Sequence, residues 1–436
     1  MRRLTLALLP ALLHVALACT APAHALDKPG LDRTLAAIQA DPMHPLSGLV
    51  VVAVKDGRIV YEGAFGQAVL DPGRERPLTV DTRVRVASLS KVPMALAAMD
   101  LAEAGRLDLD RDVGDYLGFP LRNPAFPDRP ITARMLLTHT SSIRDGEIYG
   151  LPVQHALSDF FDPASPYWEG GAHWSAGHPP GAFFTYSNLG IGVLATVIER
   201  IEGKRFDRVV AERVLAPLGI RAAWDVRTLS DADFQVLAPV HRLEEGRWKP
   251  QVDDHQGRRP DGMVSPFGVT ATAPLSAYVV GRNATTLSPQ GGLRASAAEV
   301  ATLLRLLLGK GAVDGKGILE PASVQAMLTE AWTHDPNAHG GRGNGETERG
   351  FYTGWGLGLQ YRIPIPGTSG RFCGHLAEAY GLLGGMILDP QRGIGWVYLL
   401  TGTSAEPKDY PVPGSGLSRW EVEVSRAVWE QLTAAP

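Results

Sequence analysis

The sequence predicts a mixed α/β (α+β) protein, in which one antiparallel sheet of about five strands is flanked by helices and a mainly helical domain is inserted. Two observations lead to this fold class. β-Rich runs gather near both ends of the chain, and a helical pattern adjoins each set. The middle of the chain consists mostly of helical patterns and Pro/Gly-rich loops. We therefore expect a sheet domain from residues 26–110 and 290–436, with residues 111–289 as the inserted domain.

The first 25 residues are typical of a secretory signal peptide. Two arginines precede an apolar run (4–17), and the segment ends in a small-x-small cleavage site at Ala25. The run is too short for a membrane-spanning helix. Cleavage near Ala25 predicts a periplasmic or secreted protein without a stable membrane span. Lipid attachment at Cys19 is the alternative, which the residues before this cysteine fit poorly.

The N-terminal half of the sheet is predicted from a helix and a hairpin. Leucine and isoleucine recur at helical spacing over residues 31–38. Two β-rich runs follow, 46–54 and 58–65, and Asp56-Gly57 lies between them. An Asp-Gly pair between two such runs is a strong hairpin signal.

The C-terminal half contributes three strands and a helix. The runs 371–376, 380–389 and 393–401 are rich in β-branched, aromatic and glycine residues, with turn signals between the last two. After them, apolar residues line one face of a final helix at Trp420, Val424, Val428 and Leu432.

Ser88 and Lys91 form the first candidate for chemistry, in the stretch V-R-V-A-S-L-S-K-V-P-M-A. Residues three apart on a helix share a face, so Lys91 is expected to face Ser88 rather than the adjacent Ser90. A serine hydroxyl needs a base, and lysine acts as one only when its pKa is lowered by burial or nearby positive potential. The alternative is a helix-capping serine followed by a surface lysine.

Tyr186 and Asn188 form the second candidate, immediately before a clear amphipathic helix that ends at Gly203. In an extended tripeptide the two side chains point the same way. A phenol near Ser88 can relay protons, and an amide can hold a substrate carbonyl or N–H. The alternative is a capping asparagine and a half-buried tyrosine.

His375 is the third candidate, on the first C-terminal strand. A histidine there can donate a hydrogen bond or carry charge near a reacting group, although a structural role is the alternative. The glycine-rich run 339–350 is interpreted as a mobile surface loop rather than as the border of a site.

Other chemistries find little support in the sequence. The formal net charge of −4 gives no argument for nucleic-acid binding. The chain lacks the G-x-S-x-G, H-E-x-x-H, paired C-x-x-C and phosphate-loop motifs. His173 and His178 lack a third ligand, so neither a metal nor another cofactor is expected. The expected partner is a small-molecule or peptide substrate.

Taken together, the three candidates resemble the serine β-lactamase and penicillin-binding protein superfamily. Ser-x-x-Lys, Tyr-x-Asn about a hundred residues later and a basic residue on a late strand occur in the order of that superfamily. The likeness is greatest to its class C β-lactamase, DD-carboxypeptidase and esterase branch. It extends to further motifs at 101–113, 135–145, 214–220, 291–300 and 355–359.

The resemblance implies a role for each residue. Ser88 becomes the acylated nucleophile and Lys91 its base. Tyr186 passes the proton to the leaving group or activates the deacylating water, so the division of labour between Lys91 and Tyr186 stays open. Asn188 orients the substrate amide. His375 takes the position usually held by lysine, and the backbone N–H groups of Ser88 and Glu378 form the oxyanion hole.

One departure from the family pattern bears on the substrate. The third motif normally ends in glycine, but this chain has Ala377, whose methyl group can narrow the cleft or shift Glu378. Histidine in place of lysine also weakens recognition of a carboxylate. The sequence thus predicts an exported serine hydrolase acting on an ester or amide, with strong β-lactamase activity disfavoured. A weakly active or inactive relative that binds cell-wall peptide or another ligand is the alternative.

Overall fold

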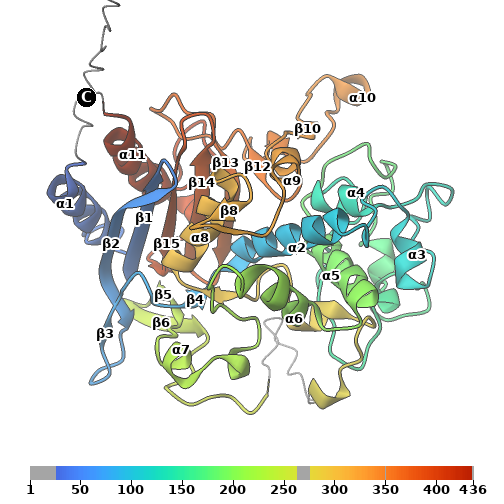
Figure 1. Ribbon diagram of the computed structural model, residues 1–436, viewed down its shortest axis with the longest axis horizontal. Coiled ribbons are helices and arrows are strands. Elements are labelled where there is room, and N and C mark those ends of the chain that lie inside the picture. The colour runs from blue at the N-terminus through green and yellow to red at the C-terminus, as the bar shows by residue number, and fades with distance from the viewer. Residues whose placement is uncertain (1–25, 263–274, 349, 435–436) are drawn as a thin grey trace, which may run out of the picture.

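The computed structural model describes residues 26–262, 275–348 and 350–434. The predicted signal segment and Cys19 lie outside these residues. Within them, a nine-stranded antiparallel sheet forms the centre of the fold, with the strand order β10-β11-β12-β13-β14-β15-β1-β2-β3. The mixed α/β architecture expected from the sequence is confirmed (Figure 1).

Five long strands make up the middle of this sheet, and they are the five predicted from the sequence. They are β13 (Cys373–Ala379), β14 (Leu382–Asp389), β15 (Ile394–Leu400), β1 (Gly48–Lys55) and β2 (Arg58–Val69). The two ends of the chain meet where β1 pairs with β15, in a register that places Val52 opposite Val397. At the β1–β2 turn, Asp56 and Gly57 have φ angles of 50° and 74°, as a two-residue hairpin turn with right-handed twist requires.

Four additional strands, each two residues long, extend the sheet beyond the five predicted. They are β10 (Trp332–Thr333), β11 (Gly354–Trp355), β12 (Gln360–Tyr361) and β3 (Arg76–Pro77). Two residues are too few to produce an alternating pattern, so hydrophobic periodicity gives no signal for them.

Two layers of helices cover the sheet. Alternate residues of β1 face opposite sides: Leu49, Val51 and Ala53 pack with α1 (Lys28–Gln39) and α11 (Arg419–Thr433), whereas Val50 and Val52 pack with the other layer. That other layer includes α8 (Ala297–Leu308), which contacts β1, β14 and β15. In Figure 1, α1 and α11 lie together at the side of the sheet away from α2 and α5.

The remaining helices and strands lie mostly between and around these layers. The helices are α2 (Lys91–Glu103), α3 (Val113–Leu117), α4 (Ala133–Leu137), α5 (Asn188–Glu202), α6 (Phe206–Val210), α7 (Asp231–Gln235), α9 (Pro321–Met327) and α10 (Ala338–Gly341). The small sheets comprise β5 (Val240–Glu244), β6 (Arg247–Val252) and β16 (Gly402–Thr403), then β4 (Val84–Arg85) with β7 (Arg294–Ala295), and β8 (Ala312–Val313) with β9 (Lys316–Gly317).

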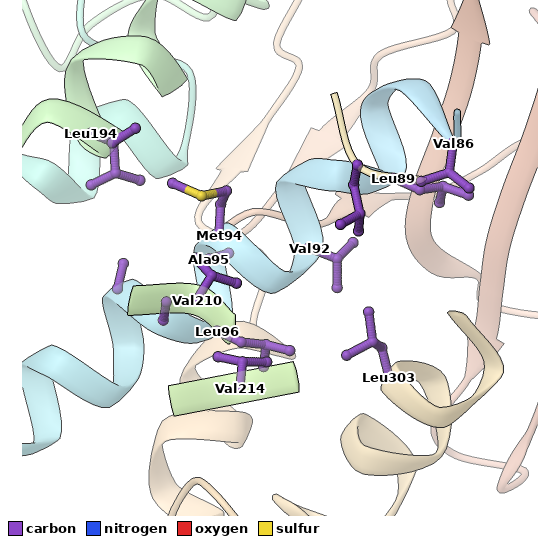
Figure 2. Close-up of a cluster of buried hydrophobic side chains, with 14 of the residues drawn as sticks. Val86, Leu89, Val92, Met94, Ala95, Leu96, Leu194, Val210, Val214 and Leu303 are labelled. Carbon is purple, nitrogen blue, oxygen red and sulfur yellow. The ribbon is translucent and has the colours of Figure 1, made fainter. Parts of the chain in front are cut away.

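Helix α2 runs through the interior of the molecule. Its residues from Lys91 to Met99 are all buried, and it has no polar face. Figure 2 shows Met94, Ala95 and Leu96 of α2 among side chains that include Leu194 of α5 and Leu303 of α8. A helix that is apolar all round is a core helix, so its first turn, which carries Lys91, is held rigidly and away from water.

Candidate active site

Ser88 lies in a tight 3₁₀ turn, η1 (Ala87–Ser90), that leads directly into α2. The preceding Ala87 has a φ of 45°, a left-handed conformation that is uncommon for a residue with a side chain. Such strain persists only where the surrounding packing enforces it, and here β4 and α2 hold both ends of the turn. Ser88 is half-buried and lines a cavity of about 320 Å³.

Lys91 lies within hydrogen-bond distance of three oxygen atoms. Its Nζ lies 3.0 Å from Ser88 Oγ, 2.8 Å from Asn188 Oδ1 and 2.8 Å from the carbonyl oxygen of Gln290. The predicted Ser88–Lys91 contact is therefore confirmed, and the surface-lysine alternative is wrong because Lys91 is 1% exposed. The amide and carbonyl oxygens can only accept, so a neutral Lys91 gives them its two N–H groups and directs its lone pair at Ser88.

Burial lowers the pKa of Lys91 to about 7, and Asp145 opposes part of this effect. Removal from water disfavours the charged ammonium more than the neutral amine. A substantial fraction of Lys91 is consequently neutral near pH 7, and neutral lysine is the form that accepts a proton from Ser88.

Tyr186 is the second side chain that contacts Ser88 Oγ. Its hydroxyl donates to Ser88 Oγ at 3.0 Å, and its ring stacks on Tyr352 at 5.3 Å with an interplanar angle of 7°. Burial raises the pKa of Tyr186, so the phenol keeps its proton at neutral pH. The different directions of these two shifts make Lys91 suited to accept a proton and Tyr186 suited to donate one.

Asn188 is held in one orientation by Asp145. Asp145 accepts from Asn188 Nδ2 at 2.8 Å, which turns Asn188 Oδ1 toward Lys91, and it also accepts from the Leu189 N–H at 2.9 Å. The sequence-based alternative of Asn188 as a helix cap is wrong. Ser187 is the N-cap of α5, and its hydroxyl accepts from the Gly190 N–H at 3.0 Å, which leaves Asn188 to contact Lys91.

His375 lies on β13 beside the cavity and is 2% exposed. Its Nδ1 is 2.7 Å from the carbonyl oxygen of Leu376, and since a carbonyl only accepts, Nδ1 carries the proton. The Nε2 lone pair has no donor among the described residues. Burial, with the nearby Lys91, lowers the pKa of His375 to about 3, so the ring is neutral at physiological pH.

Glu378 and Ala377 follow His375 on the same strand. Glu378 is exposed and lines two cavities that Ser88 also lines. Ala377 is 4% exposed, and the cavity of about 320 Å³ remains open with its methyl group in place. All six residues predicted for the site therefore border one cavity or, for Lys91, contact a residue that does.

Three contributions to this site were not predicted from the sequence: the Asp145 carboxylate, the Gln290 carbonyl and Glu348. Asp145 ends the motif at 135–145, which was noted without a role, and Gln290 immediately precedes the motif at 291–300. The interpretation of the 339–350 run as a surface loop that does not border a site is wrong, because the Glu348 side chain lines the Ser88 cavity.

The sequence matches the Beta-lactamase family model over residues 31–412. The chain belongs to the beta-lactamase family. Protein Rv1367c of Mycobacterium tuberculosis is 30% identical over 383 residues, which cover 81% of this chain and 86% of that protein. The resemblance found in the motifs is thus confirmed over most of the chain.

Further relatives in the beta-lactamase family include a penicillin-binding protein and an esterase. Penicillin-binding protein 4 of Amycolatopsis lactamdurans is 27% identical, over 72% of this chain and 71% of its own. Esterase EstB of Burkholderia gladioli is 31% identical, over 53% of this chain and 62% of its own. The solved structure of EstCE1, a hydrolase with promiscuous acyltransferase activity, superposes with a TM-score of 0.62 at 23% identity, covering 92% and 99% of the two chains.

Within the part of this family member that the structure describes, no helix is both long and apolar enough to cross a membrane. His173, weighed above as a metal ligand, is fully buried, and its Nε2 lies 3.0 Å from the carbonyl oxygen of Tyr167. His178 stacks on Phe183 with ring centroids 3.8 Å apart.

Proposed function

We propose that this chain is an exported serine hydrolase that cleaves an ester or amide through a covalent acyl-enzyme on Ser88. The observation that carries the proposal is the placement of Ser88 Oγ, 3.0 Å from both Lys91 Nζ and the Tyr186 hydroxyl. One neighbour is suited to remove the serine proton and the other to supply a proton to a leaving group. The leader-like composition of residues 1–25 supports export.

In the proposed reaction, Lys91 takes the Ser88 proton as Oγ forms a bond to the substrate carbonyl carbon. The negative charge that develops on the carbonyl oxygen is stabilised by the backbone N–H groups of Ser88 and Glu378. Tyr186 gives its proton to the leaving oxygen or nitrogen as that bond breaks, and Lys91 returns a proton to Tyr186. Water then attacks the acyl carbonyl carbon and passes a proton through Lys91 to Ser88 Oγ as the bond between Oγ and the acyl carbon breaks, which releases the carboxylic acid. Asn188 orients the substrate amide and holds Lys91.

Ester and amide substrates are favoured over efficient β-lactam turnover because His375 is neutral. A cationic side chain in this position would attract the carboxylate of a β-lactam, whereas an uncharged imidazole offers no such attraction. The relatives named penicillin-binding protein and esterase support both substrate classes for this chain. The geometry supports acyl transfer to Ser88 and is compatible with cleavage of either an ester or an amide bond.

Labelling with a fluorophosphonate tests the proposal. The full-length protein or its exported form is expected to gain one adduct per chain, on the tryptic peptide of residues 86–91, with fragmentation placing it on Ser88 rather than Ser90. Penicillin, which carries a carboxylate, is expected to give a slower or shorter-lived adduct. If the folded protein forms no adduct with either reagent, the proposal fails and a ligand-binding relative becomes the better description.

A further inference from the structure

The cavity in front of Ser88 is acidic. Three glutamates line it, namely Glu348, Glu378 and Glu421, and among the described residues no lysine or arginine does. Glu421 is committed to the fold, since it accepts from Tyr398 and Ser418. Glu348 and Glu378 are exposed at the cavity, which leaves their carboxylates available to a ligand.

Two neighbouring acids form ion pairs, whereas Glu348 and Glu378 form none among the residues that the structure describes. Glu346, two residues from Glu348, pairs with Arg144 at 2.9 Å. Glu406 pairs with Arg242, the cation that also acts on Glu378 from a distance. No lysine or arginine of the described residues forms an ion pair with Glu348 or Glu378. Burial raises the pKa of both carboxyl groups, and repulsion by the carboxylates of Glu346 and then Glu378 raises the pKa of Glu348 further. A cation between Glu348 and Glu378 would relieve that repulsion.

The unpartnered His375 is a second and independent observation. Its ring lines the same cavity, and its protonated nitrogen is occupied by Leu376, so the nitrogen left without a partner is an acceptor. A buried acceptor without a donor is costly, and a ligand N–H group would satisfy it. A carboxylate, which only accepts, would leave it unsatisfied.

Aromatic rings form the rest of the wall. Tyr186, Tyr352, Trp355 and Phe351 line the cavity, and the first three contact one another through stacked or edge-on ring pairs. Aromatic faces attract cations and leave anions without compensation for lost water. Arg85 lies on the other side of Ser88, where its guanidinium donates to the Gly291 carbonyl and the Ser288 hydroxyl.

From these features we infer that the natural substrate carries an ammonium group, which binds between Glu348 and Glu378 against the aromatic wall while Ser88 attacks the neighbouring carbonyl. This inference rests on the proposed hydrolase function and adds a substrate class to it. The ammonium group belongs either to the acyl part or to the leaving group. Both sources present the same chemistry to the cavity, so two series of substrates distinguish them.

The first series varies the acyl part with a constant leaving group. The p-nitrophenyl esters of 6-aminohexanoate, heptanoate and adipate place an ammonium, a methyl or a carboxylate at the end of similar chains. The second series compares the choline ester of butyrate with its uncharged 3,3-dimethylbutyl counterpart. Each kcat/KM is divided by the rate of spontaneous hydrolysis. We expect the cationic member of at least one series to be favoured about tenfold, the size typical of screened charge complementarity.

Variants assign the preference to the carboxylates. In Glu348→Gln the preference for the cation is expected to fall about threefold or more, and further in the double variant with Glu378→Gln. Glu212→Gln is the matched control, because its exposed carboxylate is paired with Lys204 and does not line the cavity, and the charge preference of this variant should equal that of the wild type. The readout is the ratio between substrates, so a general loss of activity does not mimic the effect.

Two results would overturn the inference: uncharged or anionic esters that match or exceed the cationic ones in both series, or a preference that survives in the double variant. Ester hydrolysis that depends on Ser88 but shows no charge preference would reject the inference and leave the hydrolase proposal standing. Hydrolysis that is the same in Ser88→Ala would reject the hydrolase proposal itself.

Discussion

Ser88→Ala is expected to lower kcat/KM for a p-nitrophenyl ester by about 10⁴-fold or more. The variant loses the only oxygen that both Lys91 and Tyr186 contact within hydrogen-bond distance among the described residues. Neither neighbour can form the acyl-enzyme in its place, so only substrate binding and oxyanion stabilisation would remain. Initial rates of p-nitrophenolate release, corrected for spontaneous hydrolysis, measure the effect.

Ser90→Ala serves as the control for this result. The Ser90 hydroxyl is fully buried, donates to the Ala87 carbonyl at 2.6 Å and accepts from the Leu293 N–H at 3.0 Å, so it supports the turn without facing the cavity. Loss of the buried hydrogen bonds should lower the free energy of unfolding by about 1–3 kcal/mol, which is measured as a lower melting temperature. The variant should keep most of its activity. Equal activity of Ser88→Ala and the wild type would contradict the proposed nucleophile.

Lys91→Met is expected to lower kcat/KM by about 10³-fold, within the range for loss of a general base. Methionine has a similar length and suits the buried position, but it cannot accept the Ser88 proton. Lys204→Met provides a matched control, because Lys204 is exposed and pairs with Glu212 on the surface. Activity of this control should equal that of the wild type.

The pH profile tests the same residue in a second way. Because the pKa of Lys91 is lowered to about 7, the amine is increasingly protonated below that pH and cannot act as a base. The logarithm of kcat/KM for the wild type should therefore rise by one per pH unit below about pH 7 and level off above it. This limb should be absent from the residual activity of Lys91→Met. A limb that persists in the variant would assign the titration to another group.

Much of the fold was predictable because its long elements carry strong local signals. The Asp56-Gly57 turn, the continuous apolar run of β1 and the apolar face of α11 each follow from residues close together in sequence. The two-residue strands at the sheet edge depend on tertiary pairing instead, and no local pattern marks them.

The contacts in the site also differ in how well the sequence predicts them. Ser88 and Lys91 are one turn apart, so helical geometry alone brings them together. The Asp145–Asn188 and Lys91–Gln290 contacts join segments 43 and 199 residues apart, and one of them uses a backbone carbonyl that any residue type provides. The sequence alone could not exclude the alternative of Asn188 as the helix cap, for a similar reason. Serine and asparagine both cap helices well, and only the tertiary contact with Lys91 decides between them.

The neutral state of His375 follows from burial and from the nearby Lys91, and the amino-acid sequence alone shows neither of these. The third motif therefore offers a substrate no positive charge. The position that the resemblance would assign to a lysine holds a hydrogen-bond acceptor here, and the same cavity is lined by two carboxylates that form no ion pair among the described residues. We therefore expect this chain to prefer substrates that carry hydrogen-bond donors or a positive charge.

The most direct measurement of the central claim is the mass of the protein during turnover of an ester. The reaction of p-nitrophenyl butyrate with the wild type is stopped by acid at short times, and the intact mass is recorded beside Ser88→Ala and Ser90→Ala. A covalent mechanism predicts that a fraction of the wild type and of Ser90→Ala gains the mass of one butyryl group, carried by Ser88, and that Ser88→Ala gains none. A butyryl group that persists in Ser88→Ala, or turnover by the wild type in which no acyl group is trapped at any time, would contradict the acyl-enzyme on Ser88.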